Sequence, residues 1–145
     1  MDADSEEILD FLAEEGYRAR AEPDGAIRLK SEGQFIILQV SQVEGMPALA
    51  TSMGLFCRHD GVADAVTRAR LLTERMTVIK ASVPEQGVAC FVAEQCGTLD
   101  SFKLTFELIL DGLHVAARKF FDPSHRTVDE DDSDLPITAT GYPFG

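Results

Sequence analysis

The strongest constraint on the fold is a long amphipathic segment in the last third of the chain. Between Asp100 and Pro123 one row of apolar residues recurs at intervals of three and four: Phe102, Phe106, Ile109, Leu113, Ala116 and Phe120. This spacing predicts an α-helix that Asp100 caps and Pro123 ends. A second row, formed by Leu104, Leu108 and Val115, lies on roughly the opposite side. A helix that is apolar on two sides needs two covers. We expect one to be its own sheet and the other to be the tail, the first helix or a second subunit.

The first residues predict a shorter helix followed by a β-hairpin. Asp4 and Glu7 have the spacing of a capping box, so the helix should begin near Ser5 and end at Gly16. The chain then alternates on both sides of the turn signal Pro23-Asp24-Gly25.

The register of this hairpin can be predicted from its two alternating segments, 17–22 and 26–31. A three-residue loop with Gly25 in the left-handed conformation pairs Ala21 with Ile27 on one face. The same register sets arginine against arginine on the other face.

Four further strands and a middle helix complete the pattern. Residues 34–40 carry apolar side chains on both faces, as a central strand does, and 49–56 form a strand with a bulge expected at Gly54. Residues 77–83 and 88–96 predict a second hairpin. Asp60 should cap the middle helix, whose predicted apolar stripe is Val62, Ala65, Val66, Ala69, Leu72 and Met76. The order helix, hairpin, two strands, helix, hairpin, helix predicts an α+β fold with a mainly antiparallel sheet backed by helices.

Charge and composition bound the partners and the compartment. The 25 acids and 13 bases give a net charge of −12, which repels nucleic-acid backbones and anionic membrane surfaces. No apolar run approaches the ~20 residues of a membrane span, and the acidic first residues are unlike a signal peptide. We therefore expect a cytoplasmic protein that binds neither nucleic acid nor membranes. One domain should cover 1–121, followed by a poorly ordered tail at 122–145 with six acids and one base.

Three segments carry a family resemblance: residues 12–18, which lead into the Pro-Asp-Gly hairpin, residues 73–80, which pass from helix to strand, and the helix that starts at Asp100. In these segments the chain resembles the YbjN family, small bacterial sensory transduction regulators whose fold is similar to that of type III secretion chaperones. The family often has a Trp-Asn or Val-Asn pair at the helix-to-strand passage, whereas this chain has Leu71-Leu72-Thr73 and no tryptophan. The resemblance implies a small acidic dimer that binds an unfolded stretch of a client polypeptide.

The most informative predicted surface is the cationic face of the first hairpin, which carries four of the thirteen bases: Arg18, Arg20, Arg28 and Lys30. Like charges directly opposite in a sheet are destabilising. One interpretation is that acids of the first helix or of the tail neutralise them, or that their long stems cover the sheet. The other is a partner-binding patch for an acidic segment or an anionic ligand.

Two helical surfaces are candidates for contact with a client or with a second copy in a homodimer. One is the second row of the long helix, Leu104, Leu108 and Val115. The other is the middle helix, which by resemblance to secretion chaperones would help to form a dimer interface. Its residues off the main stripe are Ala63, Arg70 and Leu71. An ordinary core helix with one exposed leucine explains this second surface equally well.

No catalytic or metal-binding motif emerges, and we expect no metal and no cofactor. Cys57-Arg58-His59 places a thiol near an imidazole, but neither Cys-x-x-Cys nor His-Glu-x-x-His occurs. We interpret the three cysteines as buried hydrophobic residues and His114 as a partly exposed structural residue. The sequence thus predicts a non-enzymatic, chaperone-like or regulatory domain that engages a polypeptide segment. The alternative is a small ligand-binding or enzymatic domain with a pocket between sheet and helix, to which Cys57, His59 or the basic hairpin would supply polar groups.

Overall fold

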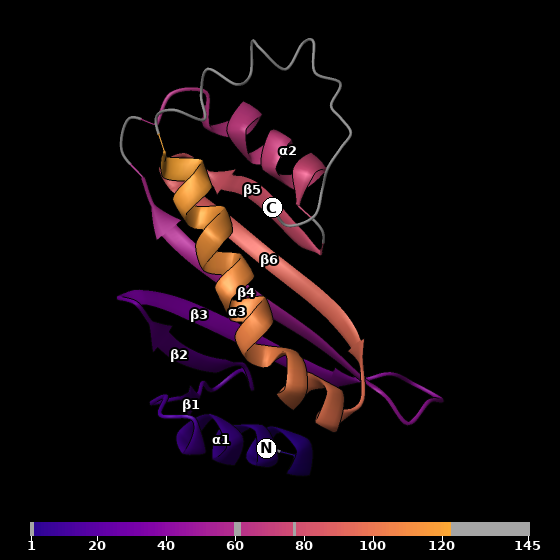
Figure 1. Ribbon diagram of the computed structural model, residues 1–145. Coiled ribbons are helices and arrows are strands. Elements are labelled where there is room, and N and C mark those ends of the chain that lie inside the picture. The colour runs from indigo at the N-terminus through magenta and orange to yellow at the C-terminus, as the bar shows by residue number, and fades with distance from the viewer. Residues whose placement is uncertain (1, 60–61, 77, 123–145) are drawn as a thin grey trace.

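The α+β class and the antiparallel sheet predicted from the sequence are confirmed. The computed structural model describes residues 2–59, 62–76 and 78–122 (Figure 1). In chain order its elements are α1 (Ala3–Glu14), β1 (Arg20–Ala21), β2 (Ile27–Ser31), β3 (Gln34–Gln42), β4 (Leu49–Arg58), α2 (Ala65–Arg75), β5 (Ile79–Glu85), β6 (Val88–Gly97) and α3 (Leu99–Phe121). The predicted tail lies outside the described residues apart from Asp122.

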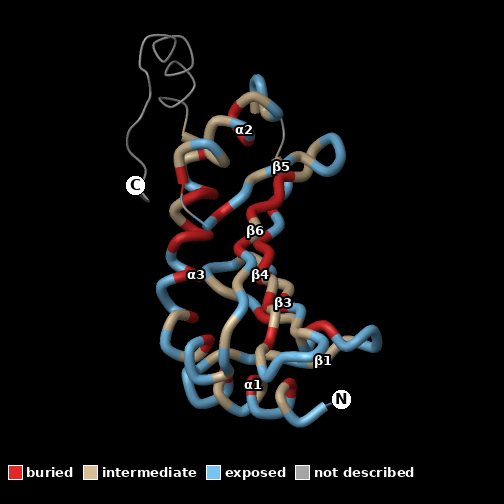
Figure 2. The backbone as a smooth tube through the Cα atoms, turned by 90° about the vertical axis from the view of Figure 1, so that its right-hand side faces the viewer, coloured by how far each residue is buried: buried red, intermediate tan, exposed pale blue. Residues whose placement is uncertain are grey.

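The sheet has the strand order β1-β2-β3-β4-β6-β5, and every neighbouring pair is antiparallel. α3 packs across one face, α1 lies at the β1 end and α2 lies at the β5 end (Figure 1). A view at right angles shows α3 on one side of the sheet (Figure 2). No described helix packs across the centre of the other side. We call the covered side the helix face and the uncovered side the open face.

The core lies between the helix face and α3. Ile36, Leu55 and Phe91 lie opposite one another on β3, β4 and β6, and all three are fully buried. α1 adds the buried side chains of Ile8 and Leu12. The row predicted along α3 is buried in full: Phe102, Phe106, Ile109, Leu113, Ala116 and Phe120. Since burial of one such side chain contributes about 1.5–3 kcal/mol, this layer supplies most of the apolar stabilisation.

Two helix starts differ from the sequence prediction. The carboxylate of Asp2 caps α1 by accepting a hydrogen bond from the backbone N–H of Ser5 at 2.8 Å. Thr98 and Ser101 cap α3 reciprocally, because each hydroxyl accepts the other's backbone N–H at 3.0 Å. The sequence predicted Asp4 and Asp100 as the caps. Both predictions are wrong, because these residues lie inside the first turn of α1 and of α3.

The predicted register of the first hairpin is confirmed. Ala21 lies opposite Ile27, and Gly25 has a positive φ of 92° in the loop. The first strand is shorter than predicted, with only two residues. The backbone N–H of Tyr17, at the start of the predicted strand, instead donates to the carbonyl of Leu12 at 2.9 Å and closes the end of α1.

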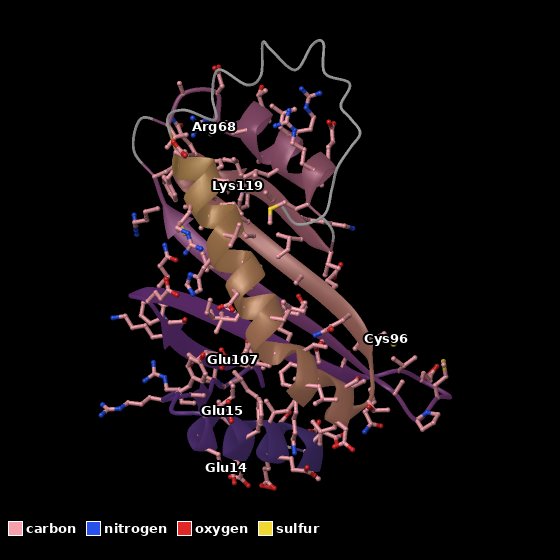
Figure 3. The ribbon with its side chains drawn as sticks, in the orientation of Figure 1. Glu14, Glu15, Arg68, Cys96, Glu107 and Lys119 are labelled. Carbon is pink, nitrogen blue, oxygen red and sulfur yellow. The ribbon has the colours of Figure 1, made fainter. Side chains whose placement is uncertain are left out.

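A buried arginine interrupts the predicted apolar stripe of α2. The predicted cap, Asp60, lies outside the described residues, and Val66 is 70% exposed. Arg68 is buried instead, and its guanidinium donates hydrogen bonds to the backbone carbonyls of Phe120 and Asp122. These carbonyls are at the C-terminal end of α3, where the helix dipole favours a positive charge. Figure 3 shows Arg68 at this end of the helix.

α2 also closes one edge of the sheet. The Thr73 hydroxyl donates to the Ala81 carbonyl at 3.0 Å and accepts from the Ala81 N–H at 2.7 Å. Ala81 lies on β5, the outermost strand at this end. These bonds satisfy backbone groups that an edge strand would otherwise offer to another chain.

Candidate functional site

The open face is built from the alternate residues of the same strands that form the core. Because side chains alternate across a sheet, neighbours of core residues point to the open face. Its two central rows are Phe35–Phe56–Cys90 and Ile37–Gly54–Val92. Phe35 is 44% exposed and Phe56 is 42% exposed. β3 is central in the sheet, as predicted, but only one of its two apolar faces is covered.

Cations border this apolar surface. The guanidinium carbon of Arg28 lies 4.1 Å from the centre of the Phe35 ring, and Lys30 Nζ lies 5.5 Å from it. Such cation–π contacts contribute about 0.5–1 kcal/mol when they are exposed. Strand alternation also places the exposed residues Arg58 and Lys80 on this face. We define the cation–aromatic patch as Arg28, Lys30, Phe35, Ile37, Phe56 and Val92.

The patch keeps an excess of positive charge. Arg20 lies opposite Arg28, and the two guanidinium groups share one carboxylate, that of Glu22, at 3.8 and 3.5 Å. In the described residues the neutralising acid is therefore Glu22 and not an acid of the first helix. Arg28 Nε is buried and has no hydrogen-bond partner among the described residues. Arg18 is exposed just before β1, outside the two strand pairs that join β1 to β2, so only part of the predicted cationic face is in the sheet.

Gly54 leaves room for an aromatic ring. The predicted bulge is wrong, because the pairing of β4 with both neighbours continues without a shift through Gly54. A Cβ atom at this position would lie 3.2 Å from Cε1 of Phe56, so the ring lies against the glycine. The absence of a side chain allows Phe56 to lie along the sheet instead of standing away from it.

The other end of the open face has the opposite charge. A cavity of about 810 Å³ lies there between the β1–β2 loop, the start of α1 and the ends of the central strands. Asp2, Asp24 and Glu94 line it, and no lysine or arginine does. The open face is therefore cationic and aromatic at one end and acidic at the other.

The second apolar row of α3 is exposed. Leu104 is 85% exposed and Leu108 is 65% exposed, whereas Val115 is partly buried against the core. α1 packs on another side of α3, where Phe11 meets Phe106 with ring centres 5.8 Å apart. The sequence left three possible covers for this row: the tail, the first helix or a second subunit. The first helix does not cover Leu104 or Leu108.

The candidates on the middle helix form a separate surface. Ala63 precedes α2, which begins at Ala65, so its predicted place on the helix is wrong. Ala63 and Arg70 are exposed, and Leu71 is partly buried. α2 lies by the C-terminal end of α3, near Lys119, whereas Leu104 and Leu108 belong to its first half (Figure 3). The predicted site residues thus fall on three surfaces: the open face, the outer side of α3 and α2.

A polar cluster lies where the end of α3 meets the β2–β3 turn. Ser31 Oγ is 2.9 Å from Nε2 of His114, which is buried and not partly exposed as predicted. Glu32 Oε1 lies 3.9 Å from His114 Nδ1 and 4.0 Å from the Arg118 guanidinium. Glu32 and Gly33 have φ values of 52° and 80°, as a two-residue hairpin turn requires. The cluster borders a cavity of about 380 Å³. Sequence reasoning missed it because Ser31 and His114 lie far apart in the chain.

Cys57 and His59, two residues of the predicted alternative site, contact different neighbours. Cys57 Sγ accepts a hydrogen bond from Gln34 Nε2 at 3.1 Å, and the His59 ring packs edge-on against Phe120 at 5.5 Å. Burial raises the pKa of Cys57 to about 11, which disfavours the nucleophilic thiolate. Cys96 is exposed, so the prediction of three buried cysteines is wrong for this residue. The described residues contain no group of three or more metal-ligating side chains.

No family model, curated protein or solved structure matches this chain. Among the described residues, no helix is long and apolar enough to cross a membrane. The functional interpretation therefore depends on the geometry of the chain itself.

Proposed function

We propose that this protein is a non-enzymatic, chaperone-like or regulatory domain of the cytoplasm that binds an acidic polypeptide segment on its open face. The observation that carries the proposal is the stacking of Arg28 and Lys30 on the exposed ring of Phe35, on a sheet face whose centre no described helix packs across. The YbjN resemblance implies the same class of function.

The patch offers two kinds of interaction to an extended segment. Phe35, Phe56 and their neighbours provide apolar contact area, whereas Arg28 and Lys30 attract carboxylates. Aromatic and arginine side chains are the residues that most often dominate binding energy at interfaces. The acidic end of the open face, which includes Glu94, would orient the segment by repelling its carboxylates.

Fluorescence polarisation with a labelled 12-residue peptide that alternates acidic residues with leucine and phenylalanine tests this proposal. The full chain should bind this peptide and should not bind a peptide with lysine in place of each acid. Arg28→Glu should weaken binding by about tenfold, because it reverses the charge at the centre of the patch. Equal binding of both peptides would contradict the proposal.

Arg70→Glu is the matched control, because it makes the same charge change on an exposed position of α2. The proposal predicts unchanged affinity for this variant. If Arg70→Glu weakens binding and Arg28→Glu does not, the client surface is on α2.

Homodimer formation is a separate part of the proposal, supported by the exposure of Leu104 and Leu108 one turn apart on α3. Two antiparallel copies of α3 related by a twofold axis would set Leu104 against Leu108 of the partner subunit. Light scattering at several concentrations should show a dimer that Leu108→Glu converts to a folded monomer. A monomer for both proteins would contradict dimerisation through this row.

A second candidate function is favoured by the Ser31–His114 pair alone. A serine hydroxyl within hydrogen-bond distance of an imidazole is the arrangement of an activated nucleophile. A fluorophosphonate would phosphonylate such a serine, with release of fluoride and transfer of the hydroxyl proton to His114. Mass spectrometry distinguishes the candidates. Our proposal predicts no label on Ser31, whereas a label that His114→Gln abolishes would support an enzyme.

A further inference from the structure

A segment of this chain has the chemistry that the open face would bind. Residues 129–134 contain five carboxylates in six positions, and Leu135 and Ile137 follow at once. The cation–aromatic patch offers the complementary groups, cations beside exposed aromatic rings. Charge complementarity therefore points to an occupant within the chain itself.

The end of α3 lies close to the end of the sheet that carries the patch. Asp122 borders the same cavity as Glu32 and Gln34. Gln34 is the first residue of β3 and precedes Phe35, so this cavity adjoins the patch around the β2–β3 turn. Six extended residues, 123–128, span about 20 Å at most. A connection of this length leaves the start of the acidic run no farther than about 20 Å from the end of α3.

We propose that residues 129–137 occupy the cation–aromatic patch in cis and compete there with a client. The carboxylates of 129–134 pair with Arg28 and Lys30, and Leu135 and Ile137 pack beside Phe35 and Phe56. The acidic end of the open face excludes the opposite orientation. The competition with a client rests on the proposed function. The contact between residues 129–137 and the patch does not depend on it.

Residues 123–128 connect the acidic segment to α3, so even a weak contact with the patch can compete with a client. A connection of six residues gives an effective concentration on the order of 1 mM. If the segment binds with a dissociation constant of about 0.1 mM, it weakens client binding by about tenfold. Because the contact is largely electrostatic, salt should release it.

Carbodiimide cross-linking of the full chain tests the contact, since this reagent joins a lysine amine to a carboxylate that touches it. At low salt, mass spectrometry should find Lys30 joined to an acid of 129–134. The Lys103–Glu7 pair, at 3.2 Å, is the internal positive control. Lys30→Arg keeps the charge and should abolish only the first cross-link. Equal cross-linking of the segment to Lys30, Lys103 and Lys119, or none to Lys30, would overturn the inference.

A second measurement separates this inference from the proposed function. The variant with every acid of 129–134 replaced by its amide should bind the labelled acidic peptide about tenfold more tightly than the natural chain. If the peptide binds both proteins equally and no Lys30 cross-link forms, the intramolecular contact is refuted and the proposed function stands. If neither protein binds the peptide although the Lys30 cross-link forms, the proposed function fails and the contact stands.

Discussion

The two faces of the sheet are made from the same strands, yet they differ in every property that bears on function. On β4, Leu55 is fully buried under α3, whereas the next residue, Phe56, is 42% exposed on the open face. The helix face has one continuous apolar layer, and the open face combines exposed rings with unevenly distributed charges. The comparison teaches that an alternating apolar pattern identifies both faces of a strand but not which of them is covered. Coverage depends on where the helices pack.

The largest difference between the faces should appear in stability. Phe91→Ala removes a fully buried ring from the helix face and should lower the free energy of unfolding by about 3–5 kcal/mol. Phe35→Ala on the open face should cost about 1 kcal/mol, because much of that ring is in water already. Urea unfolding measures both. Equal losses would show that the open face is covered.

The stability of the helix packing should also depend on one polar contact, that of Arg68 with the end of α3. Arg68→Met removes the guanidinium that binds the carbonyls of Phe120 and Asp122, and it should cost about 2 kcal/mol, because these acceptors are left without their donor. Arg70→Met on the exposed side of the same helix is the control and should change stability by less than about 0.5 kcal/mol. Similar effects of the two variants in thermal unfolding would mean that the contact does not stabilise the fold.

A smaller effect is expected at the start of α3, the main cover of the helix face. Thr98→Ala removes one half of the capping box and should cost about 1 kcal/mol. Asp100→Asn, at the cap predicted from the sequence, should cost only a few tenths of a kcal/mol through the helix dipole. The reverse order in urea unfolding would restore Asp100 as the cap.

The smallest effect concerns the thiol on the helix face. Burial raises the pKa of Cys57 to about 11, so the folded state favours its neutral form. This contribution to stability is complete below the ordinary thiol pKa and is lost as pH rises towards about 11. Cys57→Ala should therefore flatten the fall in stability between about pH 9 and 11. An unchanged pH profile in thermal unfolding would show that Cys57 does not contribute.

Thiol labelling of the native protein checks the burial of each cysteine without a mutation. At neutral pH the exposed Cys96 should react with a disulfide reagent, whereas Cys57 and Cys90 should react only after unfolding in urea, because both are buried with raised pKa values. Rapid reaction of Cys57 in the native state would contradict its burial on the helix face.

Sequence reasoning was most successful where local chemistry decides the structure. The Pro-Asp-Gly turn and the alternation around it were sufficient to predict the pairing of Ala21 with Ile27. The pattern of α2 predicted the wrong side at Val66, because the core position is taken by a buried arginine two residues later, on the opposite side of the helix. Arg68 could not have been predicted from periodicity, since its partners are carbonyls at the end of a helix some fifty residues later.

The candidate site was predicted only in part. The cations at Arg20, Arg28 and Lys30 were identified from the hairpin alone, but Phe35 and Phe56 were not. They belong to the site because β2, β3 and β4 are neighbours and because no described helix packs across the centre of their side. Arg58 and Lys80 join the same face through the strand order, which the sequence did not specify. Long-range topology, and not residue type, was the missing information.

The most direct test of the central claim is an NMR titration of the full chain with the acidic 12-residue peptide. Backbone amide shifts should change at Arg28, Lys30, Phe35 and Phe56, with little change along α3. This result would locate the binding surface on the open face. Changes centred on Leu104 and Leu108, or no changes at all, would contradict the account.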